Sequence, residues 1–245
     1  MVYFNRSGNV VCGAALMNNR RTRQFLLYGV LAIGFLLPVV TSIGILFGRF
    51  RLHDATQTRL LFRVIYQVAG LLSLYFALRY QGRKLKDLGF SIGTWLRDVG
   101  HGFGLFLGVL LLSVALYFGL IAFIPWLRGA LRPTYDAAAL FGTRVTALTV
   151  LWAVALNPFH EELLVRAFLI TEMEALYHST LLAVLVSVSL QTSYHLYQGP
   201  QAALSHVPTF LVFSWYYVRT RRILPVILAH LLLDASALAI YATHL

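Results

Sequence analysis

The stretch FLLYGVLAIGFLLPVVTSIGILFG, residues 25–48, contains no charged side chain and decides the fold class of this sequence. A helix needs about 20 apolar residues to cross the hydrocarbon core of a bilayer. This run is longer than the apolar part of an ordinary signal peptide, and no clear small-residue cleavage site follows it. We therefore interpret it as a first membrane span.

Further apolar stretches follow, separated by charged loops, and we interpret them as spans over residues 60–80, 103–126, 145–176, 181–197, 202–218 and 223–241. With 59% hydrophobic and 12% charged residues, the chain is too apolar to cover a water-soluble domain. The sequence predicts an all-α, polytopic transmembrane bundle of about seven or eight spans. We expect a basic N-terminal segment (1–24), then one transmembrane domain (25–245) with its functional core in about 145–245.

The net charge of +11 comes mainly from arginines that lie between the apolar stretches. This placement indicates membrane topology and contact with lipid headgroups, and it argues against nucleic-acid binding. With the N-terminus in the cytoplasm, thirteen basic residues lie on the inner side and six on the outer side. We expect a multi-pass protein of this orientation, and the small, arginine-rich chain favours a bacterial inner membrane. The single cysteine, Cys12, excludes an internal disulfide.

Ionisable side chains inside the predicted spans are the candidates for function, because they are costly there. Those that we single out are Glu161, Glu162, Arg166, His195, His230 and Asp234. Glu162 and Arg166 are four residues apart on one helix face, so we predict an ion pair between them. Glu161 is rotated from Glu162 by about 100° and has no cation three or four residues away. His160 is expected to be structural.

The spacing of Glu161 and His195 predicts that they meet inside the membrane. They lie 34 residues apart, with a polar break near His178 midway between them. Two antiparallel helices joined there would place both side chains about 25 Å from the turn. His230 and Asp234 form a second pair four residues apart, on the last predicted span, and we expect this pair to reach the same cavity.

Such a set of side chains favours direct attack of water on an amide. A carboxylate and a histidine can hold a water and take its proton, and a second histidine can donate to the developing oxyanion. No serine or cysteine nucleophile stands in a recognised setting. Two histidines and a carboxylate are also a plausible zinc set, although residues 160–164 lack the second histidine of HExxH. Zinc remains the alternative.

Three motifs carry a resemblance to a known family. Residues 161–166, EELLVR, resemble EExxxR; residues 191–195, QTSYH, resemble FxxxH; and residues 230–234, HLLLD, resemble Hxxx(N/D). Residues 86–90, KDLGF, resemble a short segment that precedes the core in the same proteins. The C-terminal two-thirds of the chain therefore resembles the CAAX prenyl protease and bacteriocin-processing family, abbreviated CPBP or Abi.

The resemblance implies a glutamic-type intramembrane peptidase without a cofactor. Glu161 and His195 would activate the water, and His230 would stabilise the oxyanion with Asp234 beside it. Glu162 and Arg166 would support the site. The implied substrate is a protein or peptide associated with the lipid bilayer.

Three positions depart from the family pattern. Gln191 replaces the phenylalanine of FxxxH, and Val165 replaces the aromatic residue common before the arginine; both are expected to change pocket shape more than chemistry. Asp234 stands where the prenyl-protease branch has asparagine. An ionised aspartate cannot donate to an oxyanion, so we expect it to orient His230, which puts prenyl-CAAX specificity in doubt.

Two non-proteolytic functions stay open on the sequence. A membrane immunity or scaffold protein would not need Glu161 as a base. A proton-coupled transporter could use buried glutamate and histidine as a relay. The motif spacing favours the peptidase.

Overall fold

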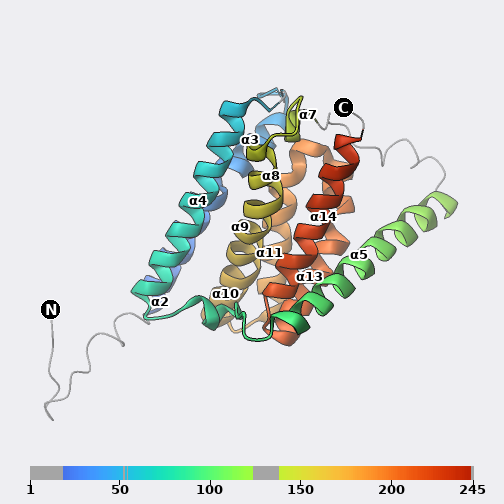
Figure 1. Cartoon of the computed structure of the whole chain (residues 1–245). Coiled ribbons are helices and arrows are strands. Elements are labelled where there is room, and N and C mark those ends of the chain that lie inside the picture. Colours follow the sequence, from blue (N-terminus) through green and yellow to red (C-terminus); the bar gives the residue numbers. More distant parts are fainter. Residues whose placement is uncertain (1–18, 52, 54, 124–137, 244–245) are drawn as a thin grey trace, which may run out of the picture.

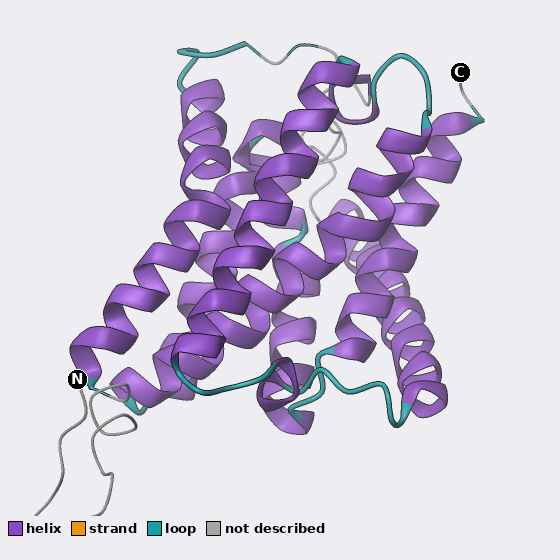
Figure 2. Ribbon diagram, turned by 60° about the vertical axis from the view of Figure 1, so that its left-hand side comes forward, coloured by secondary structure: helices purple, strands orange, loops and turns teal. Residues whose placement is uncertain are grey.

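The computed structural model describes residues 19–51, 53, 55–123 and 138–243. Most of the predicted basic segment, with Cys12, and the end of the predicted span 103–126 lie outside the described residues. The described residues form helices and no strand (Figure 2). The prediction of an all-α fold is confirmed.

Four helices among the described residues are long and apolar enough to cross a membrane. They are the rod Arg20–Leu46, α4 (Gln57–Tyr80), most of α5 (Trp95–Phe123) and α14 (Leu224–Ala242). The rod consists of α2 (Arg20–Leu31), the π-helical η1 (Ala32–Leu36) and α3 (Leu37–Leu46). It begins earlier than predicted because Asn19 caps it, accepting a hydrogen bond from the backbone N–H of Arg21.

Most of the remaining helices lie between these long ones (Figure 1). They are α7 (Ala138–Phe141), α8 (Ala147–Val150), η3 (Leu151–Leu156), α9 (Asn157–Glu161), η4 (Glu162–Phe168), α10 (Leu169–Tyr177), α11 (Thr180–His195), η5 (Leu196–Gln198), α12 (Pro200–Ser205) and α13 (Val207–Thr220). The predicted span count is not confirmed. α11 has 16 residues and α13 has 14, so both fall short of the length of an ordinary span.

The predicted turn near His178 is present. α10 ends at Tyr177, His178 takes a left-handed conformation with φ 54°, and α11 begins at Thr180. The Ser179 side chain caps α11 by accepting from the backbone N–H of Leu182. The two helices pack against each other, as two helices joined by a short turn are expected to do.

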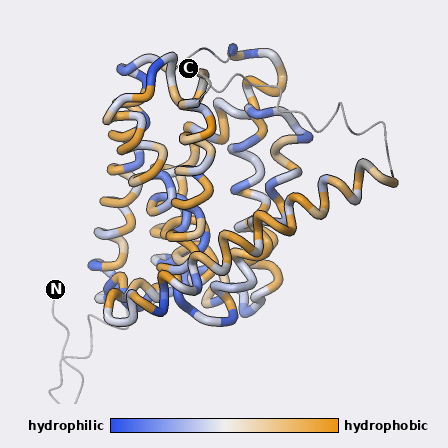
Figure 3. Tube along the Cα trace, turned by 45° about the vertical axis from the view of Figure 1, so that its right-hand side comes forward, coloured by the Kyte–Doolittle hydropathy of each residue, from blue (hydrophilic) through white to orange (hydrophobic). Residues whose placement is uncertain are grey.

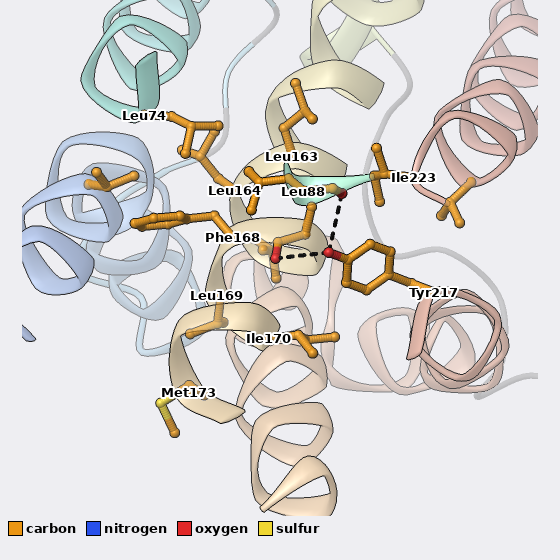
Figure 4. Close-up of a cluster of buried hydrophobic side chains, with 14 of the residues drawn as sticks. Leu74, Leu88, Leu163, Leu164, Phe168, Leu169, Ile170, Met173, Tyr217 and Ile223 are labelled. Carbon is orange, nitrogen blue, oxygen red and sulfur yellow. Dashed lines mark hydrogen bonds between the residues drawn. The ribbon is translucent and has the colours of Figure 1, made fainter. Parts of the chain in front are cut away.

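The core of the bundle surrounds η4 and the start of α10, where residues 163–170 are all buried (Figure 4). The Tyr217 hydroxyl of α13 lies 3.2 Å from the carbonyl oxygen of Leu88 and 3.3 Å from that of Ala167. Leu88 belongs to the short helix η2 (Leu85–Leu88), which overlaps the 86–90 segment. Gly89 follows with φ 81°, pressed against the backbone of Arg221, where a Cβ atom would clash. This segment therefore ties the centre of the bundle to the α13–α14 turn.

His160 fills the crossing between the N-terminal rod and α4. A Cβ atom on Gly70 would lie 2.6 Å from His160 Nε2, and one on Gly34 would lie 3.3 Å from the same nitrogen. The imidazole is fully buried, with the rings of Phe35 and Tyr66 at centroid distances of 4.8 and 5.5 Å. These contacts support the structural interpretation of His160.

α5 diverges from the bundle toward its C-terminal end (Figure 3, where it is largely orange). It packs on α13 and α14, and Gly102 allows close approach, because a Cβ there would lie 2.8 Å from the side chain of Leu228. Beyond that contact many of its apolar side chains are exposed, for example Leu111 at 67%, although Val109 is buried. Exposure of so many large apolar residues is typical of a surface that faces lipid.

Candidate active site

Arg166 and Glu162 form the predicted ion pair at the centre of the bundle. Arg166 Nε lies 3.0 Å from Glu162 Oε2, and both side chains are fully buried. The pair lies in the π-helical η4, a local geometry found frequently at functional sites. The guanidinium also donates to Ser187 Oγ of α11, Ser214 Oγ of α13 and Gln191 Oε1 of α11. One cation therefore joins three helical segments.

Glu161 is the last residue of α9 and lines a cavity of about 330 Å³. It does not touch Arg166 directly. Its Oε2 accepts a hydrogen bond of 3.1 Å from Gln191 Nε2, and the buried Tyr194 lies beside it on the same cavity wall. The rotation by one residue therefore points the two glutamates in different directions, as the sequence predicted: Glu162 pairs with Arg166 and lines a second cavity, while Glu161 faces this one.

His195 ends α11 and lines the same cavity as Glu161. Its Nδ1 lies 2.8 Å from the backbone oxygen of Gln191. A carbonyl only accepts, so Nδ1 carries the hydrogen and Nε2 of the neutral ring keeps a lone pair. The expectation that Glu161 and His195 reach the same part of the bundle is confirmed.

His230 of α14 lies between two carboxylates. Its Nδ1 is 2.9 Å from Glu162 Oε1, and its Nε2 is 3.5 Å from Asp234 Oδ2. The first distance is a hydrogen bond, whereas the second is longer than a normal N–H···O bond. Glu162 therefore orients the ring, and Nε2 is not committed to Asp234. Both His230 and Asp234 line the cavity that contains Glu161, as expected.

Two amides that the sequence did not single out complete the site. Asn157 Nδ2 donates to Asp234 Oδ2 at 3.1 Å, and Asn157 Oδ1 accepts from Gln67 Nε2 at 2.8 Å. Neither side chain is charged, so neither stands out among the ionisable residues of the spans. The available signals are the position of Asn157 one helical turn before Glu161 and the position of Gln67 within an apolar span.

These contacts form one polar chain across the bundle. In order, its members are Gln67, Asn157, Asp234, His230, Glu162, Arg166, Gln191 and Glu161. Only the step between Asp234 and His230 is longer than a hydrogen bond. Each member restricts the orientation of the next, so the groups that face the cavity are held in place before any substrate binds.

The site opens on two sides. The cavity of about 330 Å³ lies against α3, α4 and α9. A second cavity, of about 760 Å³, is lined by α5, α12, α13 and α14. His195, His230 and Asp234 contact both. An extended peptide bound in the larger cavity would therefore contact His195 and His230, while Glu161 would lie beyond them in the smaller cavity.

A metal centre was the alternative reading of these residues. Within the described ranges, no three histidine, cysteine, aspartate or glutamate side chains are arranged to hold a metal ion. The carboxylates of Glu162 and Asp234 instead contact His230, and Glu162 is also paired with Arg166.

Fold and site together define a helical membrane protein with a buried acid–histidine centre. Residues 143–236 match a protein family described as Type II CAAX prenyl endopeptidase Rce1-like. The matched segment contains all six site residues predicted from the sequence. The resemblance to the CAAX protease family is confirmed over this segment. No curated protein and no solved structure matches the chain.

Proposed function

We propose that this chain is a glutamic-type intramembrane endopeptidase that hydrolyses a peptide bond of a membrane-associated protein or peptide. One observation carries the proposal: a single residue, Gln191, anchors both groups that would activate the water. Its side chain donates to Glu161, and its backbone oxygen accepts from His195 Nδ1. Both groups line one cavity, and His195 Nε2 is the nitrogen left to act as a base.

The reaction follows from the remaining atoms. Glu161 and His195 hold a water and take its proton as the oxygen attacks the carbonyl carbon of the scissile bond. The carbonyl oxygen becomes an oxyanion, to which the protonated Nε2 of His230 donates. The tetrahedral intermediate collapses, the carbon–nitrogen bond breaks, and the proton taken from water passes to the leaving amine. The products are a carboxylic acid and an amine.

Glu162 and Asp234 would prepare His230 for this step. Glu162 accepts from Nδ1, which fixes the ring and stabilises its protonated form. Asp234, held by Asn157, adds a second negative charge near Nε2 without a short bond that would block it. Arg166 balances the charge of Glu162.

The proposal includes the membrane topology. We propose that α11, α13 and the helical segment 147–177 also cross the membrane, surrounded by the longer helices. The chain then crosses seven times. We also propose that its N-terminus lies in the cytoplasm. A bacterial inner membrane is the proposed location. Burial against protein allows a shorter and more polar helix than contact with lipid does.

The test is a cleavage assay in proteoliposomes. The probes are membrane-anchored peptides, including a prenylated CAAX peptide and its unprenylated form, with products identified by mass. We expect cleavage by the wild type and a loss of at least about 100-fold in Glu161→Ala and in His195→Ala. Full activity in either variant refutes the mechanism, and loss of wild-type cleavage with a chelator favours zinc.

His178→Asn is the matched control for the histidine substitution. His178 is exposed in the α10–α11 turn, and asparagine tolerates its left-handed backbone. This variant is expected to keep wild-type activity. If it loses as much activity as His195→Ala, the loss in the latter does not report on water activation.

A further inference from the structure

Gln191 is fully buried on α11, at the position where the FxxxH motif has phenylalanine. The sequence predicted that this departure would change the shape of the pocket. In the structure, Gln191 is not among the described residues that line either cavity beside the site. Its side chain instead lies between two buried charged groups, Arg166 and Glu161.

The orientation of the Gln191 amide follows from chemistry. A guanidinium only donates, so the amide oxygen must face Arg166. The amide nitrogen then faces Glu161 and donates to its Oε2 at 3.1 Å. Phenylalanine offers neither the acceptor nor the donor. In this chain the amide therefore links the two groups, so that the position of the Glu161 carboxylate depends on that of the Arg166 guanidinium.

We propose that Gln191 is a positioning residue for the reaction, fixing the Glu161 carboxylate in the orientation that holds the attacking water. This inference rests on the proposed function. The main chain of Gln191 holds His195, and its side chain holds Glu161, so one residue sets the distance between the two groups. A substitution changes only the side chain, which separates the effect on Glu161 from the effect on His195.

Two substitutions distinguish the role of the amide oxygen, which faces Arg166, from that of the amide nitrogen, which faces Glu161. Gln191→Met keeps the approximate volume but removes both the acceptor for Arg166 and the donor to Glu161. Gln191→Glu keeps the acceptor for Arg166 and replaces the donor with a second carboxylate. Only the first is expected to lower the midpoint of thermal unfolding in detergent, because it leaves a guanidinium N–H unpaired.

Both variants are expected to lower kcat by about 10- to 100-fold, which corresponds to loss of a hydrogen bond to a charged group. KM is expected to stay within about twofold of the wild type, since Gln191 contacts neither cavity. In a Glu161→Gln background, adding Gln191→Met is expected to cause no further loss of activity, because the group that it positions is already changed.

Two controls lie close by. Ser214→Ala removes one acceptor of Arg166 without touching Glu161, so it should lower the unfolding midpoint but not kcat. Thr192→Val removes a hydrogen bond to the Val188 carbonyl on the same helix and should change neither.

The experiment uses the full chain in proteoliposomes with the peptide that the wild type cleaves fastest. Wild-type kcat in both Gln191 variants overturns the inference while the proposed function stands. An equal fall of kcat in Ser214→Ala also overturns it, because the effect would then come from weakened support of Arg166. A wild type that cleaves no peptide overturns the proposed function and this inference together.

Discussion

Arg166→Met tests whether the buried polar chain holds the bundle together. Arg166 makes four hydrogen bonds, to Glu162, Ser187, Ser214 and Gln191, and has no exposed surface. Methionine fills part of the volume but leaves the Glu162 carboxylate without its cation. The perturbation therefore removes charge compensation and leaves buried acceptors without a donor.

The size of the loss in unfolding free energy depends on which broken interaction contributes most. The serine hydroxyls lose a donor but carry no charge themselves, and Ser187 still donates to the Val165 carbonyl at 2.8 Å. The larger loss is at Glu162, because removing one partner of a buried ion pair typically destabilises a protein by about 3–5 kcal/mol. His230 continues to donate to Glu162 and offsets part of this loss. We expect about 3 kcal/mol, the low end of that range.

The assay is reversible unfolding by SDS from mixed micelles, which reports the free energy of unfolding. Arg79→Met, on the exposed last turn of α4, is the matched control and should stay within about 0.5 kcal/mol of the wild type. Adding Glu162→Gln to Arg166→Met should recover stability, since the uncompensated charge is then absent. Equal stability of Arg166→Met and Arg79→Met would refute the reasoning.

Two further substitutions test other parts of the structure. Gly70→Ala places a Cβ 2.6 Å from the enclosed His160 ring and should destabilise the folded protein by about 1–3 kcal/mol. Gly104→Ala, with open space at its Cβ, should leave stability unchanged. Equal unfolding midpoints of the two variants would contradict this packing. Asn157→Leu removes the donor to Asp234 and should lower both the unfolding midpoint and kcat, measured on the same preparation; an unchanged kcat would show that Asp234 needs no such support.

By length and composition, the structure supports four of the seven spans that hydropathy predicted, and it leaves the other three unconfirmed. The runs 25–48, 60–80, 103–126 and 223–241 correspond to the four long apolar helices, allowing for shifts at their ends. The stretch 145–176 corresponds to one unbroken run of α- and π-helical residues, 147–177, whereas α11 and α13, which overlap the stretches 181–197 and 202–218, are shorter than an ordinary span. Hydropathy reports the transfer of a side chain out of water, and it does not distinguish a protein interior from lipid. Hydropathy therefore does not decide how helices that other helices bury are placed relative to the membrane.

Local spacing predicted the parts of the site that lie on a single helix. The Glu162–Arg166 pair follows from a separation of four residues, and the different direction of Glu161 follows from helical rotation. The meeting of Glu161 with His195 needed one further assumption, a turn near His178, which the helix ends bear out. In each case the geometry is fixed within a few turns of one helix or across one tight turn.

By itself, the sequence determined that the chain is helical, membrane-embedded and equipped with acidic and histidine side chains in the spacing of the CAAX proteases. Only the tertiary structure decided how those side chains are held. The contacts of Gln191 with Arg166, of Asn157 with Asp234 and of His230 with Glu162 join helices that are distant in sequence. Such contacts depend on how the helices are packed and rotated against one another, and helical periodicity alone does not specify either.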